Sequence, residues 1–185
     1  MPTVDSSIIL LFLIVLTTGI TMFVIGKIGE AKKQDASVIV RYQAVALLVI
    51  YIFTLLVITV IGRKARGDGL IFLIPFSDFY LIIKNGYPWY YDNLIVLNLV
   101  NAALFIPVGF LSREIMRGKK LIPVIFGLVL SAVIEVVQLI TDRGVFDVND
   151  IIWNTFGTII GCGIYALYKA LWRRISNRDK QEKSH

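Results

Sequence analysis

Five long apolar runs constrain this chain more than any other feature of its sequence. They cover residues 8–25, 38–61, 93–111, 121–140 and 151–171. Each run approaches or exceeds the roughly 20 residues that a helix needs to cross a hydrocarbon core of about 30 Å. Because 57% of the 185 residues are hydrophobic, a water-soluble domain of this size could not bury the apolar surface. The sequence therefore predicts an all-α membrane protein with a five-transmembrane-helix bundle.

The distribution of basic residues predicts how the runs are oriented. If the N-terminus is outside, the inner loops and tail hold fourteen Lys and Arg residues and the outer loops hold five. Cytoplasmic loops of membrane proteins carry such an excess of positive charge. We therefore expect the N-terminus outside and the C-terminus inside. The net charge of +6 is interpreted as a topology signal and not as a nucleic-acid-binding surface.

A shorter apolar segment, residues 70–82, lies between the second and third runs and contains Pro75, Ser77 and Asp78. If this segment crossed the membrane, six basic residues would lie inside and thirteen outside, against the usual bias. We therefore expect a short re-entrant or interfacial helix on the outer side.

The pattern divides the chain into three parts. They are an N-terminal transmembrane helix and cytoplasmic loop (residues 1–37), a membrane domain (38–172) and a polar cytoplasmic tail (173–185). No positively charged segment precedes the first run, so we interpret it as a retained helix and not as a signal peptide. The tail is expected to have little structure.

Cysteine and histidine are too scarce for several kinds of site. The single cysteine, Cys162, lies in an apolar run and is expected to be a packing residue, and the single histidine, His185, is the last residue. This excludes His-based catalysis and Cys/His metal sites within the sequence. We predict no cofactor and no metal site.

Glu135 is the ionisable residue inside the fourth run. A carboxylate near the centre of a membrane helix costs roughly 2.5–3.5 kcal/mol, so such residues usually face protein or water. Ser131, Gln138 and Asp142 lie at helical spacing from Glu135, which predicts all four on one face. Either Glu135 lines a functional cavity, or it makes a structural hydrogen bond or ion pair between helices.

Amide side chains of two other runs are predicted to lie at the depth of Glu135. In the expected orientation, Glu135 lies about 7 Å below the outer end of its run, at about 1.5 Å per residue. Asn98 and Asn101 of the third run and Asn154 of the fifth lie in the same outer third. We predict a water-accessible outer cavity lined by these side chains and Gln138. For Asn98 and Asn101, hydrogen bonding between helices is the alternative.

Charged residues flank the predicted cavity. Asp147 and Asp150 follow Arg143 at the N-cap and N3 spacing of a helix start, so capping is one interpretation and cavity lining is the other. Arg63 and Arg66 follow the second run on the outer side, against the charge bias. They favour an ion pair with a buried acid or a bidentate phosphate or carboxylate site; lipid headgroup contact is the alternative.

The order and spacing of these residues resemble a known family. Asn101, Phe105, Pro107 and Gly109 look like the Asn-x-x-x-Phe-x-Pro-x-Gly signature of VanZ-like membrane proteins. The remainder of the pattern is similar at Ser131, Glu135, Gln138, Arg143, Asp147, Asp150, Asn154, Gly157 and Gly161. The Gly157 and Gly161 pair has the spacing that allows close helix approach. Arg63 with Pro75-Phe76 is similar to a looser upstream part, and the likeness covers residues 51–171.

The resemblance implies a bacterial cytoplasmic-membrane protein linked to glycopeptide or lipoglycopeptide tolerance. The family is named for a protein that confers resistance to teicoplanin, a glycopeptide that acts at the cell-wall precursor.

Three function classes follow. In the first, which we prefer, the outer cavity binds part of an amphiphile, either a lipid-linked wall precursor or a lipoglycopeptide. In the second, the chain is a membrane-embedded enzyme that modifies or hydrolyses a lipid phosphate or wall precursor. Its catalytic residues would be Glu135, as acid or base, and Asp150, with Asp147 and Asp150 as possible metal ligands. In the third, it is a transporter that needs a dimer or partner.

The predicted ligand-binding residues are common to the first two classes, and membrane lipids are expected partners while nucleic acid is not. These residues are Arg63, Arg66, Asn98, Asn101, Ser131, Glu135, Gln138, Arg143, Asp147, Asp150 and Asn154.

Overall fold

The computed structural model describes residues 20, 24, 28, 35–62, 70–76, 84 and 89–182. Its long helices in this part of the chain are α2 (Ala36–Leu56), α4 (Trp89–Ile115), α5 (Ile122–Ile140) and α6 (Val148–Glu182). A π-helical turn, η1 (Val57–Ile61), continues α2, and there are two short strands, β1 (Ile71–Phe72) and β2 (Phe146–Asp147).

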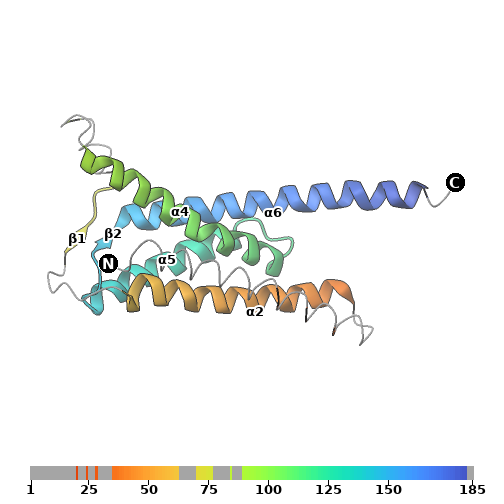
Figure 1. Cartoon of the computed structure of the whole chain (residues 1–185), viewed down its shortest axis with the longest axis horizontal. Helices are drawn as coiled ribbons and strands as arrows, with labels where there is room; N and C mark the ends of the chain where they lie inside the picture. The colour runs from red at the N-terminus through yellow and green to blue at the C-terminus, as the bar shows by residue number, and fades with distance from the viewer. Residues whose placement is uncertain are drawn as a thin grey trace.

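The helices lie side by side in a bundle (Figure 1). α4 and α6 run in the same direction, and α2 and α5 run in the opposite direction. The two strands lie at the end of the bundle where α4 and α6 begin, which we call the strand end. α6 extends beyond the other helices at the opposite end.

Each long helix includes a segment that is long and apolar enough to cross a membrane. The segments are Ala36–Ile61, Ile95–Ile115, Ile122–Ile140 and Val148–Ile175. This confirms the predicted second to fifth runs as helices and makes the chain a multi-pass membrane protein. The predicted first span, residues 8–25, lies outside the described residues except for Ile20 and Val24. The outward-facing side chains of Phe53 and Leu167 are 66% and 61% exposed, as expected of residues that face lipid.

The segment between the second and third spans differs from the prediction. Residues 70–76 contain β1 and a turn, whereas we expected the re-entrant or interfacial helix to begin here. β1 pairs in parallel with β2, with Ile71 opposite Phe146, and the Phe146 N–H donates to the Leu70 carbonyl at 3.1 Å. Apolar and β-branched residues followed by Pro75 favour extended backbone over helix. Residues 77–83 lie outside the described part.

The polar tail also differs from the expectation of little structure, because α6 continues to Glu182. Arg, Lys, Gln and Glu have high helix propensity, and extending an existing helix avoids the cost of nucleation.

The first residue before α2, Asp35, caps this helix. Its Oδ1 accepts a hydrogen bond from the Ser37 N–H at 2.8 Å. This bond holds the pKa of Asp35 below its ordinary value.

A hydrophobic core holds α2, α4 and α5 together. Its buried side chains are Leu48, Tyr51, Leu55, Val60, Phe105, Val108 and Ile134. The Tyr51 hydroxyl donates to the Leu104 carbonyl at 2.8 Å, so the one polar group of this tyrosine is satisfied within the apolar interior.

Glycines bring α4 and α6 into backbone contact. A Cβ atom added at Gly157 would lie 1.9 Å from the Ala102 carbonyl oxygen, and one at Gly161 would lie 2.1 Å from the Ile106 carbonyl oxygen. On the facing helix, a Cβ at Gly109 would lie 2.0 Å from the Thr158 carbonyl oxygen. The predicted close approach at Gly157 and Gly161 is thus confirmed, and no side chain larger than hydrogen fits at these positions.

We predict that Gly157→Ala destabilises the bundle by about 1–3 kcal/mol, because the added methyl group overlaps fixed backbone of α4. Gly163→Ala is the matched control, since a Cβ there meets nothing within 4 Å. It should be neutral, or stabilising by up to about 1 kcal/mol through helix propensity. Unfolding of the purified proteins in detergent measures both, and equal effects of the two substitutions would contradict the close-packing explanation.

Candidate functional site

Buried polar side chains from three helices gather at the strand end. None of them is more than 6% exposed, and they are Asn98, Ser131, Glu135, Gln138, Asn149 and Asn154. We call these six residues, together with Asn101, Asp147 and Asp150, the polar cluster. Buried polar groups in a membrane-spanning bundle are costly unless they are paired, so their hydrogen bonds determine what the cluster can do.

Glu135 joins α5 to the start of α6. Its side chain is 2% exposed, and its Oε2 accepts a hydrogen bond from the Asp147 N–H at 3.0 Å. The Asp147 carboxylate in turn accepts a bond from the Asn149 N–H at 2.8 Å, which caps α6. The capping interpretation of Asp147 is therefore confirmed. The Glu135 carboxylate lies beside a helix N-terminus, where negative charge is favoured.

Two further hydrogen bonds connect α6 to its neighbours. Asn154 Nδ2 donates to Ser131 Oγ of α5 at 2.8 Å, and both side chains are buried. One turn earlier, Asp150 Oδ1 accepts a bond from Asn101 Nδ2 of α4 at 2.6 Å. These contacts bring amides and acids of the third, fourth and fifth runs together, and the Asn101 bond is the hydrogen bonding between helices that was the alternative for this residue. The water-accessible cavity lined by these side chains stays a prediction.

The end of α2 is attached to the cluster through backbone carbonyl groups. Gln138 Nε2 donates to the Thr59 carbonyl at 3.0 Å, and Arg143 Nη1 donates to the Ile61 carbonyl at 2.9 Å. Both acceptors belong to η1, and the wide π turn is closed by the Gly62 N–H bonding the Val57 carbonyl at 2.8 Å. π-helical turns occur often beside functional sites. Arg143 therefore contacts the C-terminal end of the helix formed by α2 and η1.

Asn149 is a member of the cluster that the sequence reasoning missed. It is 1% exposed, and its Oδ1 accepts a bond from the Phe76 N–H at 2.6 Å. Phe76 has a left-handed backbone conformation with φ of 58°, so the turn after β1 is fixed against the start of α6. The available signal was an amide between Asp147 and Asp150 at a helix start, where the sequence reasoning considered only the two carboxylates.

Two acceptors in the cluster have no hydrogen-bond partner among the described residues. They are Gln138 Oε1 and Asn154 Oδ1, both inaccessible to solvent. Leaving a buried acceptor unpaired costs about 1–3 kcal/mol, so these oxygens mark positions where a donor would be stabilising.

The remaining predicted residues have different outcomes. Asp142 does not share the face of Ser131, Glu135 and Gln138, because α5 ends at Ile140 and Asp142 is exposed with φ of 54°. Arg63 and Arg66 lie outside the described residues. Among the described residues, no group of three acidic, His or Cys side chains is arranged to hold a metal ion, so Asp147 and Asp150 gain no support there as metal ligands.

Comparison with known proteins finds a family whose match includes the polar cluster. The VanZ/LLP1 family model matches residues 44–169, which include the whole polar cluster. Protein VanZ of Enterococcus faecium is 37% identical to the chain over 68 residues, which are 36% of this chain and 42% of that protein. The chain therefore aligns with less than half of the length of this curated relative. No solved structure matches the chain.

We predict an energetic coupling of about 0.6–1.7 kcal/mol between Ser131 and Asn154, the range found for hydrogen bonds between membrane helices. A double-mutant cycle of Ser131→Ala and Asn154→Ala, measured by unfolding in bicelles, tests it. Thr155→Ala replaces Asn154→Ala in the control cycle, because Thr155 Oγ1 bonds the Ile151 carbonyl of its own helix at 2.7 Å. The control cycle should be additive within about 0.5 kcal/mol. Additivity in both cycles would contradict the inter-helix bond.

Proposed function

Since the chain belongs to the VanZ/LLP1 family, we propose that its polar cluster binds part of an amphiphile at the outer face of a bacterial cytoplasmic membrane. The amphiphile is a lipid-linked cell-wall intermediate or a lipoglycopeptide, and its binding contributes to glycopeptide resistance. The family's link with teicoplanin motivates this choice of ligand.

The observation that carries the proposal is the burial of Glu135 within a segment apolar enough to span a membrane. Gln138 Oε1 and Asn154 Oδ1 add two buried acceptors without donors among the described residues. A purely structural cluster would gain stability by pairing these atoms. Acceptors in excess suit a ligand rich in N–H and O–H groups, which the sugar and peptide parts of wall intermediates and glycopeptides provide.

The charge distribution of the described helices supports an outward-facing strand end. Basic side chains gather at the opposite end of the bundle, at Arg41, Arg113, Arg117, Lys119, Lys120, Lys169, Arg173 and Arg174. By the positive-inside rule, this distribution supports a cytoplasmic position for the opposite end. The proposal therefore keeps the N-terminus outside and the C-terminus inside, and it places Glu135 where extracytoplasmic wall precursors lie.

A membrane-embedded enzyme is the alternative, with Glu135 as acid or base and Asp150 as a second carboxylate. The observation in its favour is the water-poor environment of Glu135, which is typical of carboxyl groups that transfer protons. Against it, hydrogen bonds from the Asp147 N–H and Asn101 Nδ2 already hold the two carboxylates. Binding therefore remains the preferred function.

We predict that Glu135→Gln abolishes any increase in teicoplanin tolerance that the chain confers on a susceptible host. The substituted amide keeps an oxygen for the Asp147 N–H, so the bundle should still fold and insert, whereas Glu135→Ala also removes that contact. Asp142→Asn removes an exposed carboxylate at the same end and is the matched control, which should retain full tolerance. Minimum inhibitory concentrations at equal membrane levels measure the effect. Unchanged tolerance in both Glu135 variants would overturn the proposal.

A second experiment separates binding from catalysis. The purified chain is incubated with a lipid-linked wall precursor, with and without Mg²⁺, while bound precursor and product are both measured. We expect saturable binding without turnover, with at least ten-fold weaker binding for Glu135→Gln, a loss of about 1.4 kcal/mol. Turnover that Glu135→Gln abolishes without weakening binding would favour the enzyme instead.

A further inference from the structure

A second polar region lies at the end of the bundle opposite the strand end, far from the polar cluster. A cavity of about 580 Å³ opens there between the end of α4 and the last turns of the α6 span. Four cationic side chains and two aromatic side chains line it: Arg113, Arg117, Lys169, Arg173, Tyr165 and Trp172. The volume falls within the range of small-molecule sites.

Two neighbouring cavities share its basic character. One, of about 500 Å³, is lined by Arg41 and Arg117, and the other, of about 330 Å³, by Arg41, Arg117 and Lys119. Arg117 lines all three cavities, so they adjoin one another at this residue. We call this region the basic end.

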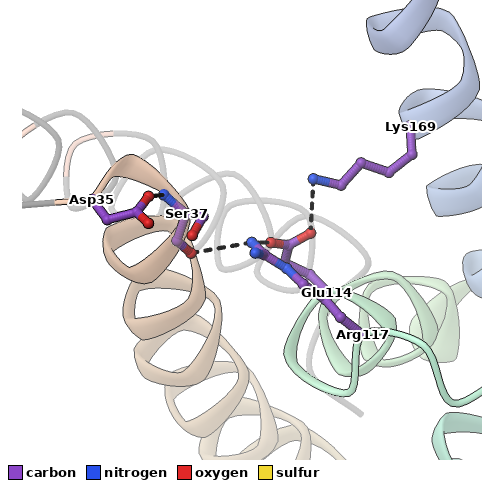
Figure 2. Close-up of polar contacts among 5 residues, drawn as sticks. All are labelled: Asp35, Ser37, Glu114, Arg117 and Lys169. Atoms are coloured by element: carbon purple, nitrogen blue, oxygen red, sulfur yellow. Dashed lines mark hydrogen bonds and ion pairs between the residues drawn. The ribbon is translucent and has the colours of Figure 1, made fainter.

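A buried acid organises these cations. Glu114 is 5% exposed, and its carboxylate pairs with Arg117 and, at 3.3 Å, with Lys169 of α6 (Figure 2). Arg117 also donates to the Ser37 carbonyl of α2 at 3.2 Å. Glu114 thereby pairs with an arginine from the turn after α4 and with a lysine of α6 at the edge of the cavity.

The basic end has more positive charge than its own acid can neutralise. Four cations line the main cavity, whereas Glu114 is the one carboxylate that pairs with them in the described part. Arg113 donates to the Lys119 carbonyl at 2.7 Å, and its guanidinium has further donors. Arg173 makes no hydrogen bond or ion pair with any described residue, and it is exposed. These unused donors favour an anion with several acceptor oxygens.

The aromatic residues place this region in the headgroup layer. Lys169 Nζ lies 5.6 Å from the Tyr165 ring centre and 5.8 Å from that of Tyr168. Trp172 is 59% exposed, three residues before the apolar span of α6 ends at Ile175. Tyr and Trp at the end of a span, beside exposed apolar residues such as Leu171, are typical of the membrane–water interface.

We propose that the basic end binds phosphate, supplied by the headgroup of an anionic phospholipid. Arg113 and Arg173 would donate to the phosphate oxygens in the bidentate manner that arginine allows, and Arg117 and Lys169 would contribute charge from the side held by Glu114. Basic pockets between membrane helices bind anionic headgroups in this way. The site is independent of the function proposed for the polar cluster.

Native mass spectrometry of the full chain in detergent tests the proposal. The probes are phosphatidylglycerol, phosphatidylcholine and inorganic phosphate. Arg173→Gln should weaken phosphatidylglycerol binding about five-fold, and Arg113→Gln/Arg173→Gln should weaken it about 20-fold. Arg174→Gln, which removes the same charge at an adjacent exposed position that does not line the cavity, should leave binding unchanged. Arg173→Gln removes no hydrogen bond or ion pair with a described residue, so its thermal unfolding should match that of the unsubstituted chain.

The possible outcomes are distinct. Preferential retention of phosphatidylglycerol, lost in Arg173→Gln and kept in Arg174→Gln, supports the lipid site. Binding of inorganic phosphate that displaces the lipid, with the same dependence on Arg173, supports the phosphate site and assigns its source to the soluble anion. Equal losses in Arg173→Gln and Arg174→Gln, or equal binding of the two lipids, would overturn the proposal, because charge alone or detergent exchange would then explain the data.

Discussion

The backbone contact between α4 and α6 sets the positions of the other groups. Gly157 meets Ala102, and Gly161 meets Ile106, which are pairs with the same separation in sequence. That register continues to the basic end, where Glu114 meets Lys169. It also places Asn101 within reach of Asp150 at the strand end. Because the helices run in parallel without intervening side chains, a shift of either one would separate polar pairs at both ends of the bundle.

The two ends have opposite chemistry within one small bundle. The strand end presents acceptors, namely the Glu135 carboxylate and two buried amide oxygens. The basic end presents guanidinium and ammonium donors around Glu114. The ligand proposed for the strand end is rich in hydroxyl and amide groups, and the ligand proposed for the basic end is a phosphate. The apolar core of Leu55, Phe105 and Ile134 between them keeps the two polar regions separate.

Much of the helical framework was predictable from the sequence, because long apolar runs leave few alternatives in a membrane. The grouping of Ser131, Glu135, Gln138 and Asn154 was also predictable, since helical spacing and span direction together determine depth. The carbonyl acceptors in η1 could not be predicted from the sequence, because a π turn depends on tertiary contacts and has no local sequence pattern. Asp142 was misplaced for a similar reason: the end of α5 is set by a left-handed residue that periodicity does not reveal.

Strand pairing and long-range ion pairs were harder still to predict from the sequence. Residues 70–76 are apolar enough to suggest a helix, and their partner strand lies more than seventy residues away in the loop before α6. Glu114 was overlooked because it lies beside Arg113 and Arg117 at the end of an apolar run, where charged residues are common. Its importance depends on Lys169, which only the packing of α4 on α6 brings within 3.3 Å.

The attachment of α2 at both of its ends has a consequence for the surrounding bilayer. The Ser37 carbonyl is bonded by Arg117 at one end, and the η1 carbonyls are bonded by Gln138 and Arg143 at the other. The 26 residues of Ala36–Ile61 measure about 39 Å at about 1.5 Å per residue, which exceeds a hydrocarbon core of about 30 Å. A helix longer than the hydrocarbon core is accommodated by tilting, kinking or local thickening of the lipid, and bonds at both ends tie α2 to the rest of the bundle in any of these adjustments.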